Sequence, residues 1–268
     1  MNSQNLLSPP LKTNVLGIGV SRTNYIECTE LIIACAKLHQ SCTVAATNVH
    51  SITTGYLDPK GHGWALRHFT LVTPDGQPIR WALNLLRKRH EPVMRDRVRG
   101  PQLMLDVCQR AEAENISIFL YGSTESVLEQ LQSKLHEMFP KLIIAGAVSP
   151  PFRRLTPEED AAYIQQILGS GAGVVFVSLG CPRQEWWAFE HRESLPRPLL
   201  CVGAAFDFHA GNVPEAPEWM QAIGLEWLYR LYKEPRRLWK RYLLLNPLYL
   251  ILFFLQMIHL LPVNYRRG

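Results

Sequence analysis

Short apolar runs alternate with helix-length segments along most of the chain, and this alternation limits the possible folds more than any other feature. Six runs rich in aliphatic and β-branched residues predict strands over 41–48, 68–75, 116–122, 142–148, 173–180 and 198–207. Helical spacing between them predicts helices over 78–89, 102–114, 126–139, 157–168 and 184–190. Strands that are apolar nearly throughout must be covered on both sides, so we predict an α/β fold: a Rossmann-like parallel sheet with helices on both faces.

Small and polar residues follow these strands at their carboxyl ends, where such sheets bind ligands. The segments are 47–48, 73–76, 121–124, 180–185 and 206–211. Two turns, 17–19 and 121–124, are candidates to face a phosphate. Neither completes the dinucleotide-binding glycine pattern, and the chain has no P-loop motif, so a nicotinamide dehydrogenase and a P-loop NTPase are poorly supported.

Asp75 has two interpretations. It stands between Pro74 and Gly76 at a predicted strand end, so it is either a turn carboxylate or a general base at the mouth of the sheet. Thr47 and Asn48 end the preceding strand. They either cap the next helix or hydrogen-bond the same ligand.

The segment GCPRQEWW (180–187) joins a strand end to a helix start. Gln184 and Glu185 are expected where the first helix amides point at a ligand, and Gln184 can hydrogen-bond a nucleobase or a sugar. Asp207 ends the last predicted strand, and we interpret the nearby His209 as a structural histidine.

Metal and cofactor sites are not expected from the sequence. No group of histidines and carboxylates has metal-ligand spacing, and the six cysteines form no zinc-like pattern. We interpret the cysteines as small buried thiols of a reducing cytoplasm, with the spacing of Cys28, Cys35 and Cys42 suited to one side of a helix. The first residues lack the pattern of a signal peptide.

The carboxyl-terminal part carries the excess of positive charge. Between Arg230 and Gly268 lie eight basic residues and one acid, whereas the rest of the chain carries 20 basic and 22 acidic residues. An uncharged apolar run, 242–262, follows the basic cluster and is interrupted by polar residues such as Asn246 and Gln256. A nucleic-acid patch, a solvated helix face and a membrane-surface element all fit the cations.

The apolar run favours the membrane, because nucleic-acid binding does not explain it and a spanning helix needs a longer clean segment. We predict peripheral attachment to an anionic bilayer, with a true span and a buried or oligomer-forming helix as alternatives, so that self-association stays open. The expected organisation is a tail over 1–14, a core over 15–215, and a helical appendage over 216–268 that is basic first and apolar afterwards.

Five motifs occur in order along the chain: TPDGQP (73–78), SPPFRRLTPEE (149–159), GCPRQEWW (180–187), CVGAAFDFHAG (201–211) and the segment 216–247. Together they resemble the WecG/TagA/CpsF glycosyltransferases, and the resemblance covers the chain from about Val15 to Pro247. The sequence over 48–56 looks more like the exopolysaccharide branch of that family than like its teichoic-acid members.

The resemblance implies an inverting bacterial enzyme that works without a metal at the inner face of the cell membrane. Such an enzyme moves a sugar from a UDP-sugar to a polyprenyl-diphosphate-linked saccharide. By motif, Asp75 is the expected catalytic base and Thr47 a nearby active-site group. The substrate contacts expected by motif are Arg97, Gln184, Arg230, Arg237 and Lys240.

Two positions depart from the family pattern. Lys240 stands where arginine is commoner, which keeps the charge but loses the bidentate fork, and Gln102 stands where an acid is expected. We expect docking on the bilayer to fold the tail helix over the pocket. A non-catalytic, membrane-docked nucleotide-sugar-binding protein is the alternative, whereas an epimerase would need the missing nicotinamide fingerprint.

Overall fold

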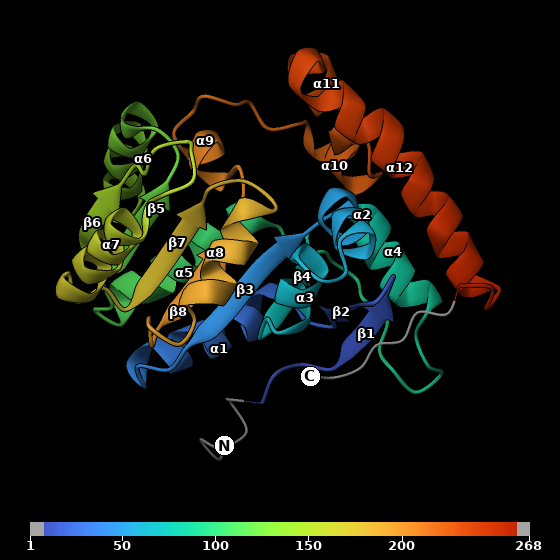
Figure 1. The fold of residues 1–268 in the computed structure, drawn as a ribbon, viewed down its shortest axis with the longest axis horizontal. Helices are drawn as coiled ribbons and strands as arrows, with labels where there is room; N and C mark the ends of the chain where they lie inside the picture. The colour runs from blue at the N-terminus through green and yellow to red at the C-terminus, as the bar shows by residue number, and fades with distance from the viewer. Residues whose placement is uncertain (1–7, 262–268) are drawn as a thin grey trace.

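A six-stranded parallel sheet is the centre of the computed structural model, which describes residues 8–261 (Figure 1). Its strands are β3 (Cys42–Thr47), β4 (Leu71–Pro74), β5 (Ile118–Gly122), β6 (Ile144–Val148), β7 (Val174–Ser178) and β8 (Pro198–Cys201). They lie in the order β4-β3-β8-β7-β5-β6, and every pair is parallel. The predicted α/β fold is confirmed.

Helices cover both faces of this sheet. One face carries α1 (Tyr25–Lys37), α5 (Gly100–Ala113), α6 (Glu125–Met138) and α9 (Ala205–His209). The other carries α2 (Val49–Leu57), α3 (His62–Arg67), α4 (Gln77–Leu85), α7 (Pro157–Gly169) and α8 (Arg183–His191). Alternate residues of each strand pack into the two hydrophobic cores, one on each face of the sheet. Leu120 and Phe176 belong to the core under the first set of helices, and Phe119 and Val177 belong to the core under the second set. This two-sided burial is why the strands read as continuous apolar runs.

An antiparallel hairpin, which the sequence did not predict, precedes the sheet. Its strands are β1 (Lys12–Val15) and β2 (Ile18–Ser21), so the expected tail over 1–14 already contributes to a strand; residues 1–7 lie outside the described part. The proposed phosphate-facing turn at 17–19 is wrong. The Gly17 amide donates to Asn14 Oδ1, and its carbonyl accepts from Arg67, so the hairpin's own contacts use these groups.

The last predicted strand is shorter than expected. β8 ends at Cys201, and residues 205–209 form α9, because the apolar run there packs as one helical turn on the first core. Cys28 and Cys35 share the buried side of α1, but Cys42 belongs to β3. All six cysteines are free thiols and five are buried, which confirms the interpretation of their packing.

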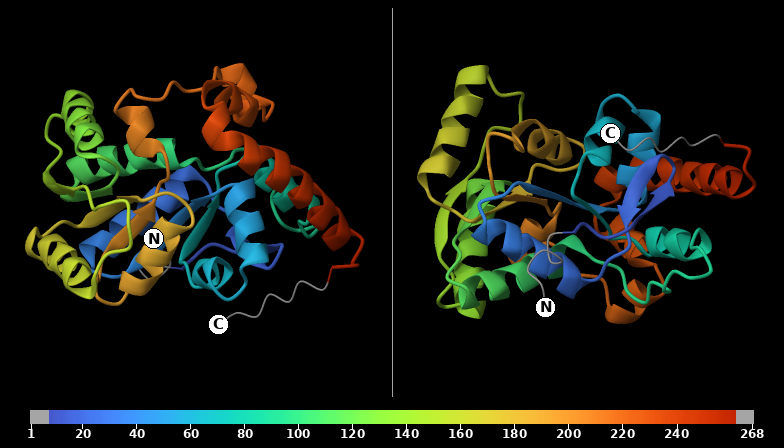
Figure 2. Two further views of the ribbon diagram at one scale, coloured as in Figure 1. Left: turned by 45° about the horizontal axis from the view of Figure 1, so that its top comes forward. Right: turned by 90° about the horizontal axis from the view of Figure 1, so that it is seen from below.

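Three helices form the carboxyl-terminal part: α10 (Glu218–Ala222), α11 (Glu226–Lys233) and α12 (Pro235–Met257). α12 runs along one side of the molecule, from above the sheet down toward the hairpin (Figures 1 and 2), and packs against α2. At its far end Gln256 donates to the Asn14 carbonyl at 2.8 Å and accepts from the Leu16 amide at 2.9 Å. The helix is therefore held against the core along its length.

The outward face of α12 is apolar. Leu243, Leu244, Leu250, Ile251 and Phe254 are all exposed. By length and composition alone α12 is able to cross a bilayer, which is weak support for a span in a single helix. The end of the apolar run predicted over 242–262 lies outside the described residues.

We expect Gly122→Ala to destabilise the protein by about 2 kcal/mol or more, because φ is 120° at this position and a Cβ would collide with the Ser178 carbonyl oxygen. Urea denaturation followed by circular dichroism measures the change. Gly169→Ala is the matched control: nothing lies within 4 Å of its added Cβ, and it should alter stability by less than about 1 kcal/mol. Equal stability of the two variants would contradict the close approach of β5 to β7.

Candidate active site

A cleft of about 430 Å³ opens over the carboxyl ends of the central strands. It lies where the connections of the neighbouring strands β3 and β8 leave for opposite faces of the sheet, since α2 covers one face and α9 the other. Its walls include Ser123 and Thr124 after β5, the segment 178–181 after β7 and the segment 202–204 after β8. Asn48 after β3, Asp75 after β4 and Asp207 in α9 line it as well, so all five strand-end segments singled out in the sequence meet here.

A second cavity, of about 470 Å³, joins the cleft beside Asp75. We call it the groove; it lies between α4, α12 and the segment 223–227. Most of its wall is apolar and includes Trp81, Leu85, Ile223, Trp227, Leu250 and Phe253. Asn48, Asp75, Glu226 and Arg230 line both cavities, so Asp75 lies at the junction of a polar cleft and an apolar groove.

The turn after β4 holds Asp75 at this junction. Its amide donates to the carbonyl oxygens of Thr47 (2.9 Å) and Thr73 (3.0 Å). Burial raises the pKa of the Asp75 carboxyl, and the nearby Glu226 raises it further, whereas Arg99, Arg97 and Arg230 act in the opposite direction. Asp75 is thus a turn residue whose side chain also lines both cavities, and its role as a general base stays a prediction.

Glu226 links the carboxyl-terminal helices to the core next to Asp75. Its carboxylate lies 2.9 Å from the Arg97 guanidinium and 3.5 Å from that of Arg99. Arg99 also pairs with Glu215 at 3.2 Å. Arg97, expected to contact substrate, therefore faces the groove with its charge already paired.

Thr47 and Asn48 differ in position although they are adjacent. Thr47 is fully buried and its hydroxyl donates to the Thr73 carbonyl at 2.8 Å, so it supports the Asp75 turn and does not line either cavity. Asn48, on the opposite side of the strand, caps α2 by accepting from the Ser51 amide at 3.3 Å. It also accepts from Arg241 at 3.4 Å and lines both cavities.

Gln184 and Glu185 form part of the cleft floor, and both are almost fully buried. Gln184 Nε2 donates to Glu185 Oε1 at 2.9 Å, while Gln184 Oε1 has no partner among the described residues. Burial raises the pKa of Glu185. The amide oxygen of Gln184 is therefore a buried acceptor without a partner at the floor of the cleft.

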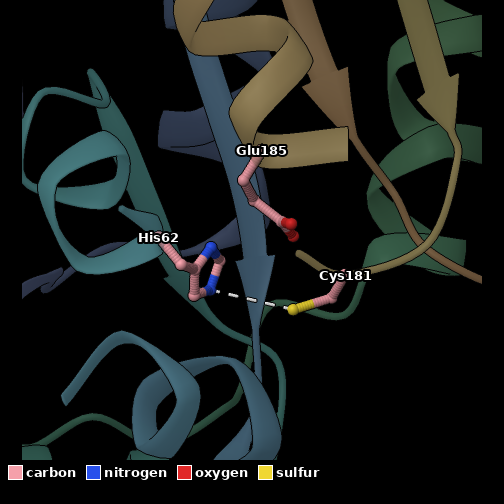
Figure 3. A group of neighbouring side chains, drawn as sticks. All are labelled: His62, Cys181 and Glu185. Carbon is pink, nitrogen blue, oxygen red and sulfur yellow. Dashed lines mark hydrogen bonds between the residues drawn. The ribbon is translucent and has the colours of Figure 1, made fainter. Parts of the chain in front are cut away.

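Glu185 also belongs to a group of three potential metal ligands with His62 and Cys181 (Figure 3). His62 Nε2 lies 3.7 Å from Cys181 Sγ and 3.0 Å from Ser51 Oγ. Imidazole, thiolate and carboxylate are ligands that zinc accepts. Within residues 8–261 these three residues are the group whose potential ligand atoms lie close enough together, all within 4.8 Å of one another, to hold one metal ion. The sequence did not predict this group because α3 and the start of α8 are far apart in the chain.

The cations of the carboxyl-terminal helices divide into two sets. Arg230 and Arg237 line the cleft as expected, the first lying over the Phe208 ring and the second 2.7 Å from Glu234. Lys240 does not: it is exposed and lies over Trp239. Arg241, one helical turn after Arg237, is in the cleft instead, because residues four apart share a helix face.

The remaining predicted residues lie around the cleft. Asp207 lines it at the start of α9, and burial raises the pKa of its carboxyl. His209 lies 3.0 Å from the Pro101 carbonyl, as expected of a structural histidine. Gln102 donates to Asp106 on the α5 surface.

A comparison with known families decides the identity. The model of the glycosyl transferase WecG/TagA/CpsF family matches residues 13–261. The chain belongs to the WecG/TagA/CpsF family. It is accordingly a glycosyltransferase of cell-wall or polysaccharide biosynthesis, and the resemblance drawn from the motifs is confirmed.

Sequence reasoning missed three residues in the cleft of this WecG/TagA/CpsF glycosyltransferase: Arg99, Glu226 and Arg241. Arg99 precedes a Gly-Pro helix start, which is a local signal of the boundary between a connection and a helix. Arg241 was missed because the prediction by motif selected the adjacent cation, Lys240. Nothing local marks Glu226, whose partners are more than 120 residues away along the chain.

Because the Thr47 hydroxyl supports the Asp75 turn, we expect Thr47→Val to lower the stability by about 1 kcal/mol, since the Thr73 carbonyl loses one of its two hydrogen bonds and keeps the one from the Asp75 amide. Thr47→Ser keeps the hydroxyl and should remain close to the native enzyme. Thermal unfolding and turnover are measured on both variants. A Thr47→Val protein of native stability that has lost its turnover would instead make Thr47 a direct participant in the reaction.

Proposed function

We propose that this glycosyltransferase moves a sugar, with inversion, from a UDP-sugar to a polyprenyl-diphosphate-linked saccharide, as a peripheral enzyme on the inner face of the cell membrane. The observation that carries the proposal is the position of Asp75 between a polar cleft and an apolar groove. A nucleotide donor suits the first cavity and a lipid-linked acceptor the second. Transfer between such substrates requires that they meet at a group able to take a proton.

The cleft has the groups that a nucleotide-sugar needs. α8 starts at its floor without a side-chain cap, so the positive end of the helix dipole lies beside the cleft and favours an anionic ligand there. Gln184 lines the floor of the cleft, and its side-chain amide has the groups to hydrogen-bond a uracil or sugar edge. Arg230 and Arg241 approach from the appendage and are suited to the negative charge that develops on the departing UDP.

In the proposed reaction an acceptor hydroxyl attacks the anomeric carbon on the face opposite to the UDP. The new glycosidic bond forms as the bond to the β-phosphate oxygen breaks, so the configuration inverts. Asp75 takes the hydroxyl proton, and UDP leaves with the bonding electron pair. A raised pKa makes Asp75 a stronger base, while the surrounding arginines favour its charged form.

The membrane part of the proposal rests on α12. Its exposed aliphatic and aromatic residues form one face, and the exposed Lys233, Arg236 and Lys240 lie near its basic end. Such cations each contribute about 1 kcal/mol near an anionic surface. α12 already packs on α2, so we expect docking to bring the acceptor to a formed site and not to fold the helix over it.

We expect Asp75→Asn to reduce kcat by about 10²–10⁴-fold, the usual contribution of a general base, while UDP-sugar affinity measured by calorimetry stays close to native. Asp96→Asn, at an exposed position nearby, is the control and should keep its turnover. Native turnover in Asp75→Asn would remove the base role. Donor binding without turnover in the native enzyme, for any acceptor, would favour a binding protein.

We expect Arg241→Ala to lower kcat by about 10²-fold or more, because a buried cation of the cleft meets the leaving-group charge. Lys240→Ala is the matched control: it should preserve turnover on a water-soluble, short-chain acceptor and weaken binding to anionic vesicles. Steady-state kinetics and vesicle flotation test the pair. An inactive Lys240→Ala with native Arg241→Ala would reverse the assignment of the two helix faces.

A further inference from the structure

The end of α4 exposes an apolar pair and a basic turn that the proposed chemistry does not use. Trp81 is 41% and Leu85 62% exposed, and the two side chains lie one helical turn apart. The four residues that follow shortly afterwards, 87–90, read Arg-Lys-Arg-His and are all exposed. Aromatic and aliphatic residues beside cations are typical of surfaces that meet lipid headgroups.

Glu91, the acidic residue that follows this basic turn, has a buried side chain. The Glu91 side chain is only 8% exposed and lies 3.6 Å from the buried guanidinium of Arg22, which also donates to the Leu83 carbonyl at 2.8 Å. The Lys88 amide donates to the Glu91 carboxylate at 3.1 Å. The turn therefore presents its cations outward while its own acid compensates a charge inside the protein.

The α4 end and α12 are the two walls of the groove. Trp81 and Leu85 line it from one side, Leu250 and Phe253 from the other. Leu250 also belongs to the outward apolar face of α12. In Figures 1 and 2, α4 lies beside the carboxyl-terminal half of α12, and residues of both helices line the same cavity.

We propose that Trp81, Leu85 and the cations of 87–89 form a second bilayer-contacting element, which we call the α4 arm. It inserts its apolar pair at the interface of an anionic membrane and places its cations among the phosphates, alongside α12. This inference rests on the proposed membrane docking of α12, with which the arm is continuous. Nucleic acid would attract the same cations, but it would leave the apolar pair without a partner.

Membrane contacts at both α12 and the α4 arm would fix the orientation of the protein on the bilayer, which α12 alone does not. A single amphipathic helix at an interface leaves the attached protein free to tilt about the helix axis. Contacts on both walls of the groove fix the tilt and direct the groove opening, with Asp75 at its inner end, toward the lipid. A lipid-linked acceptor then reaches Asp75 without leaving the membrane.

The test uses the full chain and vesicles of phosphatidylcholine with or without phosphatidylglycerol, read by flotation. We expect Lys88→Glu/Arg89→Glu to bind anionic vesicles at least about tenfold more weakly than the native protein. Lys134→Glu/Lys141→Glu makes the same change in net charge on and beside α6, across the molecule from α12 (Figure 1), and should bind as the native protein does. Turnover of Lys88→Glu/Arg89→Glu should fall on a vesicle-embedded acceptor and stay native on a water-soluble one.

Each other outcome overturns the inference in a distinguishable way. Native vesicle affinity in Lys88→Glu/Arg89→Glu removes the α4 arm and leaves α12 as the attachment. Equal losses in both double variants mean a general effect of net charge. If the native chain has no vesicle affinity, the membrane docking of α12 fails first. If Lys88→Glu/Arg89→Glu loses affinity for a short RNA duplex but not for vesicles, the turn binds nucleic acid.

Discussion

The ion pairs of Glu226 with Arg97 and Arg99 are the contact on which the site depends. They join α11 to the segment before α5, and all three side chains are largely buried, so losing one partner would leave an uncompensated charge near Asp75. The negative charge of Glu226 also raises the pKa of Asp75 and so opposes the nearby arginines, which lower it. One carboxylate therefore fastens the carboxyl-terminal helices to the core and balances the charge around the candidate base.

The basic cluster at residues 230–241 is one block in the sequence but two surfaces in space. Arg230, Arg237 and Arg241 turn to the cleft, whereas Arg236 and Lys240 turn away from it. Successive helix residues are about 100° apart, so a dense cluster necessarily serves several directions. The cleft can therefore have cations for an anionic ligand while others remain for headgroups.

The sheet, the carboxyl ends of its strands other than β8, and five of its helices were predictable, because two-sided burial and helical spacing leave regular patterns in the sequence. The family followed from its motifs. The hairpin, the helix over 205–209, the group of His62, Cys181 and Glu185, and the pairs of Glu226 were not predictable, since each depends on contacts between distant segments. The error at Lys240 has a local cause: a charge cluster does not reveal which of two adjacent cations faces inward.

Gln256 sets a limit on how α12 can meet a bilayer. Both ends of its amide are occupied by the hairpin, so sinking that turn into hydrocarbon would break two hydrogen bonds where no water replaces them. If α12 docks on a bilayer as proposed, its depth of immersion is set by the protein fold and not by bilayer thickness. Hydrophobic mismatch sorts spanning helices among membranes of different thickness, and we expect it to have little effect on which membrane this enzyme binds.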